Sequence, residues 1–290
     1  MKKIVVLLVC LASIQAYSQD FDFFFNDHYS LTWQKFNAAY VPLEQIGSLA
    51  TQHSDGTGKS RWSVGCECID RDMSVFANYK EQIGDLGVGY ARIQSGWAKC
   101  EKTKGKYDFA WLDEIIDGLN DEGVKPWVCI CYGNPIYGGA GADLGSRLFS
   151  DEETMKGWCD YVKALVRRYA DKVYGWEVWN EPNLGPNQDV HDEYTALFIN
   201  TAEIIRKYDR DAKIFGISIA EMNLRLNFVE KVLQNLKDKD KLHLMDYVSF
   251  HAYYHNPDYA TADILALRDL VQSFSKDIEL FQGEAGCPSI

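Results

Sequence analysis

The sequence has few histidines and an excess of acidic over basic residues. Lysine and arginine number 30 against 42 aspartates and glutamates, which leaves a formal net charge of −12. This balance argues against nucleic acid or an anionic membrane as a partner, since both attract basic proteins. A metal-dependent hydrolase needs clustered His and Asp ligands, and of the six histidines only His251 falls at a predicted strand end. We therefore expect neither a metal nor another cofactor.

No C-x-x-C motif is present among the cysteines. Cys66 and Cys68, and likewise Cys129 and Cys131, are separated by one residue, which places each pair on one face of a strand. This spacing argues against a zinc or redox site and favours buried, inert thiols. Removal of the signal peptide described next would leave seven of the eight cysteines, an odd number, so at least one thiol would stay free.

Long apolar runs are absent except at the N-terminus. A basic start, Met1–Lys3, precedes the apolar run Ile4–Ala12 and then small or polar residues that end near Ser18. This pattern predicts a secretory signal peptide over residues 1–18, because a bilayer span needs about 20 apolar residues. Lipidation of Cys10 is the alternative, although the bulky Val9 precedes it. We expect a secreted protein, or one in the periplasm or on the outer surface, without a membrane span.

Residues 19–60 are predicted to be a lead-in segment, and residues 61–290 one domain in which strands and helices alternate. The predicted strands are Trp62–Cys66, Tyr90–Gln94, Pro126–Tyr132, Val173–Trp179, Ala212–Ile217, Asp246–His251 and Ile278–Gly283. The predicted helices lie near Met73–Leu86, Trp111–Glu122, Glu152–Tyr169, Tyr194–Tyr208, Asn227–Leu236 and Ala262–Phe274. In the first of these, Val75, Tyr79, Ile83 and Leu86 recur at helical spacing.

Such alternation predicts parallel βαβ units, and the apolar strands predict a sheet that is buried on both faces. A dinucleotide-binding fold needs a glycine-rich turn after its first strand, but Gly65–Cys68 offers none, and no P-loop is present. Seven units therefore favour an α/β fold of the (β/α)8 TIM-barrel type. The eighth unit is missing before Ile290, so we expect either a fragment of a longer protein or completion of the barrel by the lead-in segment.

Polar and aromatic residues lie where the predicted strands end, and these ends form the active-site rim of such barrels. The fourth and seventh strands contribute the carboxylates Glu181 and Glu284; the other candidates are Glu67, Arg92, Gln94, Trp97, Tyr132, Asn134, Asn180, His251 and Tyr253. Cleavage of a glycosidic bond with retention needs one protonated and one ionised carboxyl group about 5 to 5.5 Å apart. Trp179 and Pro182 beside Glu181 make an apolar setting, which favours the protonated form of its carboxyl group.

Four segments carry a family resemblance. WEVWNEPN, residues 176–183, resembles the acid/base motif of clan A glycoside hydrolases, and most closely that of glycoside hydrolase family 39. LFQGEAG, residues 280–286, is similar to the nucleophile segment on strand seven of this clan. SFHAYY, residues 249–254, resembles the His-x-Tyr of strand six, and ARIQSGW, residues 91–97, the strand-two segment with its arginine. The resemblance covers Trp62 to Gly286 in strand order.

The resemblance implies a role for each matching residue. Glu181 would be the general acid/base and Glu284 the nucleophile, on a plant- or host-type oligo- or polysaccharide. Asn180 would bind the 2-hydroxyl of the sugar. The other implied roles are that Tyr253 positions the nucleophile, Arg92 keeps Glu284 ionised and His251 lines the sugar subsite.

Several residues keep a structural alternative. Trp97, Tyr132 and Asn134 fit either a wall of the sugar site or plain packing. Glu177 is four residues before Glu181, so the two lie about 13 Å apart along a strand, and we interpret Glu177 as structural. For the whole protein, the alternative is a carbohydrate-binding protein without catalytic activity on a truncated barrel. Release of reducing ends from glycans would separate the two functions.

Overall fold

The computed structural model describes residues 47–286, except 49, 59, 139–140, 188, 222–224 and 255. The chain divides into two compact units, Met1–Ala50 and Thr51–Ile290. The second unit thus begins before the predicted domain start at residue 61. The predicted signal peptide, Cys10 and Cys287 lie outside the described residues. None of the helices within these ranges is long and apolar enough to cross a membrane.

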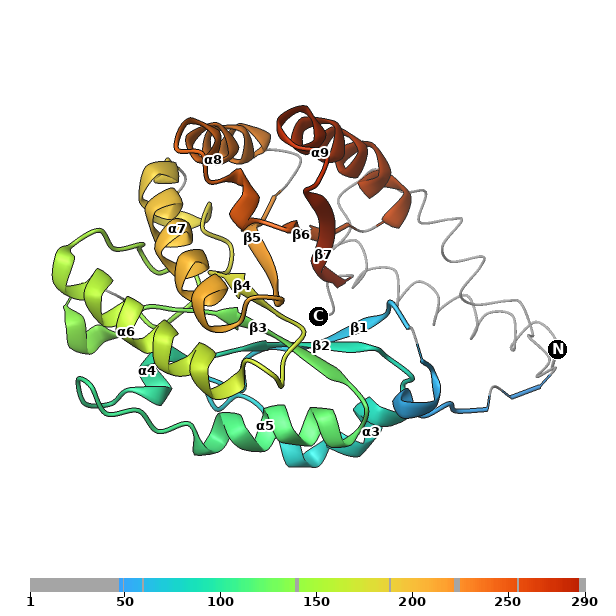
Figure 1. The fold of residues 1–290 in the computed structure, drawn as a ribbon. Coiled ribbons are helices and arrows are strands. Elements are labelled where there is room, and N and C mark those ends of the chain that lie inside the picture. The colour runs from blue at the N-terminus through green and yellow to red at the C-terminus, as the bar shows by residue number, and fades with distance from the viewer. Residues whose placement is uncertain are drawn as a thin grey trace, which may run out of the picture. The chain divides into compact units, whose positions relative to one another are not determined.

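Seven parallel strands of the second unit form one sheet, in which each strand pairs with the next along the chain. They are β1 Ser63–Cys66, β2 Tyr90–Gln94, β3 Lys125–Ile130, β4 Gly175–Val178, β5 Lys213–Ile219, β6 Tyr247–Tyr253 and β7 Glu279–Gly286. The sheet curls into a nearly closed barrel with helices on its outer side (Figure 1). The predicted TIM-barrel class is confirmed for these seven units.

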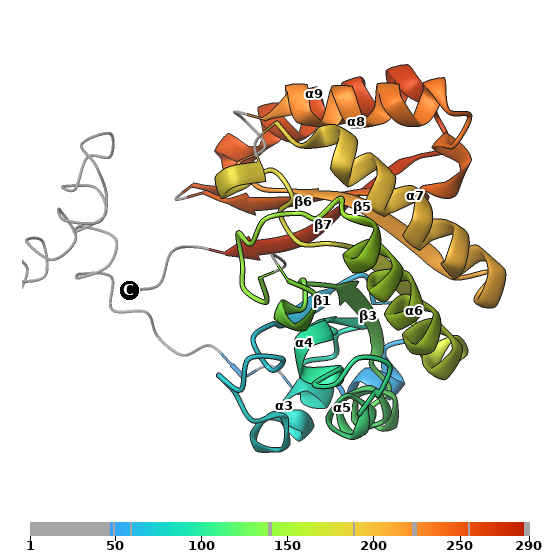
Figure 2. The same cartoon turned by 90° about the vertical axis from the view of Figure 1, so that its left-hand side faces the viewer.

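Helices follow the strands and cover them from outside, as the second view shows (Figure 2). They are α3 Lys80–Asp85, α4 Trp97–Cys100, α5 Ala110–Asp121, α6 Glu152–Tyr169, α7 His191–Tyr208, α8 Leu226–Asp238 and α9 Ala260–Phe274. Short 3₁₀ turns are η1 Ser54–Gly56, η2 Phe76–Asn78, η3 Pro135–Tyr137, η4 Gly185–Asn187, η6 Leu242–Leu244 and η7 Pro257–Tyr259.

Helix α6 has a capping residue at its start and charged residues that suit both of its ends. The Asp151 side chain accepts a hydrogen bond from the backbone N–H of Thr154 at 2.8 Å, which caps the first turn. Acidic residues occupy the first turn and Arg167 and Arg168 the last, so both ends complement the helix dipole. The predicted and observed bounds of this helix are identical.

The predicted helix over Met73–Leu86 is wrong in extent. Helix α3 begins only at Lys80, and Val75 and Leu86 are exposed. Ile83 is buried as predicted, but the first core contact of this stretch is made by Phe76. The Phe76 ring lies so close to Gly118 of α5 that a Cβ there would lie 2.7 Å from it. The predicted apolar spacing is therefore correct for Tyr79 and Ile83, which pack in or against the core, and wrong for Val75 and Leu86.

Four aromatic side chains fill the lower part of the barrel. Phe215 stacks between Trp127 and Tyr247, with ring centroids 5.7 and 5.0 Å away, and Phe281 meets Phe215 edge-on at 4.9 Å. Gly175 on β4 makes room for this layer, because a Cβ there would lie 2.8 Å from the Phe215 ring. These four rings form an aromatic floor beneath the polar residues of the rim; Trp127 and Phe215 are buried, and Tyr247 and Phe281 are half-buried.

Removal of one floor ring should destabilise the whole domain. We expect Phe215→Ala to lower the free energy of unfolding by roughly 3–5 kcal/mol, because it leaves a cavity among buried rings. Val75→Ala, at the exposed position, should change it by less than about 0.5 kcal/mol. Guanidinium denaturation measures both. Equal losses in the two variants would contradict the assigned burial.

Candidate active site

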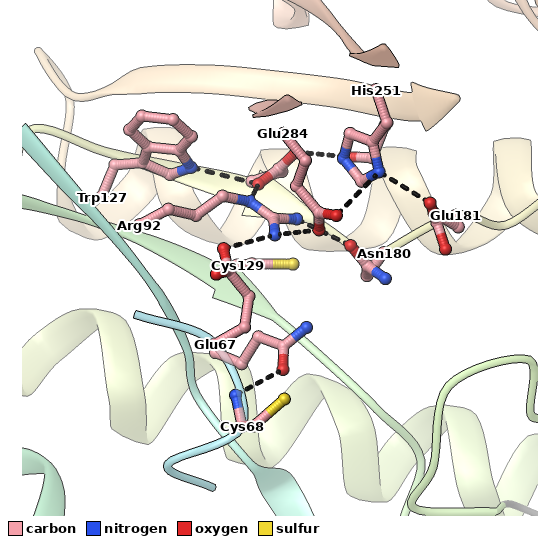
Figure 3. A network of polar contacts seen from close by, with 12 residues as sticks. Glu67, Cys68, Arg92, Trp127, Cys129, Asn180, Glu181, His251 and Glu284 are labelled. Carbon is pink, nitrogen blue, oxygen red and sulfur yellow. Dashed lines mark hydrogen bonds and ion pairs between the residues drawn. The ribbon is translucent and has the colours of Figure 1, made fainter. Parts of the chain in front are cut away.

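The guanidinium group of Arg92, on β2, is the centre of a polar cluster inside the barrel (Figure 3). Its side chain is buried. Nε donates to Glu177 at 2.6 Å, and one terminal nitrogen donates to Asn180 Oδ1 at 2.8 Å. The other terminal nitrogen donates to Glu284 at 2.5 Å and to Glu67 at 3.1 Å. One cation thus joins the ends of β1 and β4 to β7.

The pKa values of Glu177 and Glu67, which both contact Arg92, shift in opposite directions. Burial alone would raise the pKa of Glu177, but the charge and hydrogen bond of Arg92, with help from His251 and Ser218, lower it to about 2. Burial raises the pKa of Glu67 and prevails over the opposing effect of Arg92, with Glu284 adding to the rise. Glu177 is therefore the permanent counter-ion, and this placement agrees with its structural interpretation.

Glu177 also joins the cluster to the layer below. It accepts a hydrogen bond from Trp127 Nε1 at 3.1 Å and another from the Ser218 hydroxyl. Neither donor is predicted as a site residue from the sequence, because Trp127 lies in an apolar strand and Ser218 in no recognisable motif. The aromatic floor and the charged cluster are consequently one connected unit.

The carboxyl groups of Glu181 and Glu284 meet at the imidazole of His251. His251 Nδ1 lies 2.8 Å from Glu181 Oε1 and 3.5 Å from Glu284 Oε2, as Figure 3 shows. The ligand atoms of all three residues lie within 4.8 Å of one another. The Tyr253 hydroxyl donates to Glu284 Oε2 at 2.7 Å. Trp179 has a positive φ, as has Glu181, so the turn after β4 has a backbone conformation that is uncommon for such side chains.

Tyr132 is part of the same network, at its far side. Its hydroxyl accepts from Asn180 Nδ2 at 2.8 Å and from Gln94 Nε2 at 3.3 Å. Gln94 Oε1 in turn accepts from Arg71 at 2.7 Å, and the Arg71 guanidinium lies 5.6 Å from the centre of the Tyr132 ring. Arg71 was not a candidate from the sequence, because it lies in a loop without a motif.

Trp97 and Asn134 are not brought into this cluster. Trp97 is fully buried, stacks on Tyr161 with centroids 5.8 Å apart, and donates from Nε1 to Glu101 at 2.6 Å. Asn134 donates to the backbone oxygen of Glu101 at 2.7 Å and accepts from the backbone N–H of Ile136. Both side chains bind protein groups behind the rim, which favours packing over the predicted contact with sugar.

A cavity of about 650 Å³ runs along the edges of β1 and β7. Its lining includes Glu67, Tyr253 and Glu284 from the polar cluster, together with Tyr90 and Phe281. In a complete (β/α)8 barrel the eighth strand lies between the first and the seventh. The nucleophile candidate is therefore at the border between the rim and this cavity.

Glu181, His251 and Glu284 are also the one group of three possible metal ligands among the described residues. Glu284 is already paired with Arg92 and Tyr253, and the imidazole nitrogen that faces the carboxylates bonds Glu181. Hydrogen bonds within the protein therefore explain why these three side chains lie together, without a metal ion between them.

This barrel has carboxylates from its fourth and seventh units at one rim. That arrangement is the one found in the glycoside hydrolase barrels. The sequence profile of "Glycosyl hydrolases family 39" matches residues 90–282. The chain belongs to this family. The match includes Arg92, Asn180, Glu181 and His251, and it ends just before Glu284.

Solved structures with the same fold include a β-xylosidase and a family 39 enzyme. A monomeric β-xylosidase from Caulobacter crescentus CB15 superposes with a TM-score of 0.61 at 20% identity, covering 82% of this chain and 54% of that one. The family 39 enzyme from Xanthomonas axonopodis pv. citri gives a TM-score of 0.60 at 22% identity, covering 83% and 53%. At these identities the likeness establishes the fold.

Curated relatives are more distant or shorter in their overlap. The β-galactosidase BgaH of Haloferax lucentense is 29% identical over 120 residues, which are 34% of this chain and 18% of that protein. A probable mannan endo-1,4-β-mannosidase of Aspergillus clavatus is 22% identical over 215 residues, 68% of this chain and 58% of that protein. The chain thus spans less than a fifth of the galactosidase.

The buried Arg92–Glu177 pair should make stability depend on pH. The pKa of Glu177 falls from the ordinary 4.5 to about 2, so its stabilising effect is complete above pH 4.5 and is lost as the pH falls towards 2. We expect wild type to lose about 3 kcal/mol more than Glu177→Gln over this range. Guanidinium denaturation at a series of pH values tests this.

Glu67→Gln is the matched control with the opposite sign. Because the pKa of Glu67 is raised, the wild-type carboxyl lowers stability as the pH rises above 4.5, and the amide removes this loss. Parallel pH curves for wild type and Glu177→Gln would show that the ion pair does not contribute as assigned.

Proposed function

We propose that this protein is a retaining glycoside hydrolase with Glu284 as nucleophile and Glu181 as general acid/base. The observation that carries the proposal is the approach of the two carboxyl groups across the barrel, within the 4.8 Å that also includes His251. This separation suits direct attack by a carboxylate rather than attack by an interposed water molecule. Family membership supports the reaction class.

The surroundings of the two carboxyl groups support this division of roles. Glu284 receives hydrogen bonds from the Arg92 guanidinium and from Tyr253, and both hold its carboxylate in position as a nucleophile requires. Glu181 contacts His251 beside the buried Trp179. It therefore lies nearer to apolar groups and lacks an arginine partner among the described residues.

The reaction proceeds in two displacements. Glu284 attacks the anomeric carbon, the glycosidic C–O bond breaks, and Glu181 gives its proton to the leaving oxygen. Glu181 then takes a proton from water, which attacks the glycosyl–enzyme ester and frees Glu284. Arg92 and Tyr253 hold the carboxylate in place for the first step.

The substrate we propose is a β-linked glycoside from a plant- or host-type oligo- or polysaccharide. Its support is that the relatives named above are a β-xylosidase, a β-galactosidase and a probable β-mannosidase. We also propose export from the cell, and the sequence of residues 1–18 is its support.

Replacement of either glutamate tests the mechanism. We expect Glu284→Gln to lower kcat on aryl β-glycosides by at least about 10⁴-fold, since no covalent intermediate can form. Glu181→Gln should lose roughly 10²–10⁴-fold on substrates with poor leaving groups and much less on activated ones. Glu152→Gln, exposed at the start of α6, is the control and should keep wild-type rates.

Product analysis completes this experiment. Proton NMR of the first-formed sugar should show the same anomeric configuration as the substrate. Inversion, or full activity of Glu181→Gln, would contradict the mechanism. Binding of glycans without any release of reducing ends would instead identify a carbohydrate-binding protein.

Asn180 should contribute through the 2-hydroxyl group of the sugar. Its Oδ1 is taken by Arg92 and one N–H of Nδ2 by Tyr132, so the second N–H is available for substrate. We expect Asn180→Ala to lower kcat/KM roughly 10²-fold on a normal glycoside. On the 2-deoxy glycoside the loss should be several-fold smaller; equal losses would show that Asn180 does not act through this hydroxyl.

A further inference from the structure

Two buried polar atoms on β6 have no hydrogen-bond partner among the described residues: Ser249 Oγ and His251 Nε2. Both border the same small space beside Gly283 on β7. A Cβ at Gly283 would lie 2.5 Å from Ser249 Oγ and 3.1 Å from His251 Nε2. Because Gly283 has no side chain, the hydroxyl and the ring nitrogen can both lie against its Cα, in the place that a side chain would take.

The opposite ring nitrogen of His251 faces the reaction. Nδ1 lies 2.8 Å from Glu181 Oε1 and 3.5 Å from Glu284 Oε2, as Figure 3 shows. A neutral imidazole donates from one nitrogen and accepts at the other, so the partner of Nε2 decides what Nδ1 does. Charged groups approach the ring on the Nδ1 side, whereas Ser249 and Gly283 are on the Nε2 side.

The tautomer matters because Glu181 must deliver a proton. If Nδ1 carries the ring proton, it donates to Glu181 Oε1, and the acidic proton of Glu181 resides on Oε2, where a leaving group can take it. If Nδ1 is an acceptor, the acidic proton of Glu181 is directed at the ring instead. Only the first arrangement leaves Glu181 free to act as an acid.

We propose that Ser249 is a positioning residue that holds His251 in the Nδ1–H tautomer. Its hydroxyl donates to Nε2, either directly after rotation about the Cα–Cβ bond or through one water molecule beside Gly283. A hydroxyl can turn to suit its acceptor, and satisfying two buried polar atoms with one bond removes a penalty on each. The proposal rests on the assignment of Glu181 as the acid.

The first test compares leaving groups. We expect Ser249→Ala to lower kcat/KM roughly tenfold on a phenyl glycoside, whose departure needs the acid, and less than about threefold on a dinitrophenyl glycoside. Gly283→Ala, whose methyl group would displace the hydroxyl, should show the same selectivity. Ser273→Ala on the exposed side of α9 is the matched control and should leave both rates unchanged.

The second test measures the tautomer of the His251 imidazole directly. Nitrogen-15 NMR of histidine-labelled full-length protein should show the His251 proton on Nδ1 in wild type and in Ser273→Ala. In Ser249→Ala we expect a mixture of tautomers, with the signal identified by its loss in His251→Gln. Thermal unfolding of each variant confirms that the fold is retained.

The outcomes separate the two proposals. Equal losses on both glycosides, or no loss on either, would overturn the role of Ser249, as would an unchanged tautomer in Ser249→Ala. If wild type cleaves no glycoside, the proposed function fails by itself. The NMR comparison still decides whether Ser249 sets the tautomer.

Discussion

The buried guanidinium of Arg92 is the constraint on which the rest of the structure depends. A cation in a dry interior is stable only when anions and hydrogen-bond acceptors surround it. Here three carboxylates and one amide oxygen do so, and they come from the turn after β1, from β4, from the turn after β4, and from β7. The position of each strand end is thereby fixed against a single group, which an active site of separate side chains requires.

Three glutamates of the cluster, Glu177, Glu284 and Glu181, differ in role because their neighbours differ. Glu177 is held ionised by Arg92 and two neutral donors, and it belongs to the framework. Glu284 shares the same cation but is partly exposed and reaches the rim. Among the described residues, the one potentially cationic partner of Glu181 is the imidazole of His251. One residue type thus supplies a counter-ion, a nucleophile candidate and an acid candidate through environment alone.

The sequence predicted the barrel class because strand and helix patterns are local, and α6 was placed to the residue. It also placed Glu181, Glu284 and His251 at one rim, since parallel strands end together. It could not tell that Trp97 turns into the packed layer, because a tryptophan after a strand suits packing and sugar binding equally. The contacts of Ser249 and Gly283 depend on how β6 and β7 face each other, which no spacing encodes.

The Arg92–Glu284 ion pair also connects β7 to the first strands of the described sheet. Strands β1 and β7 have no ladder hydrogen bonds to each other in the described sheet, yet the ion pair ties β7 to β2 across the gap. Esterification of Glu284 by a sugar would cancel its charge and weaken that clasp. Under the proposed mechanism, the contact that orients the nucleophile is thus also the contact that the covalent intermediate would lose.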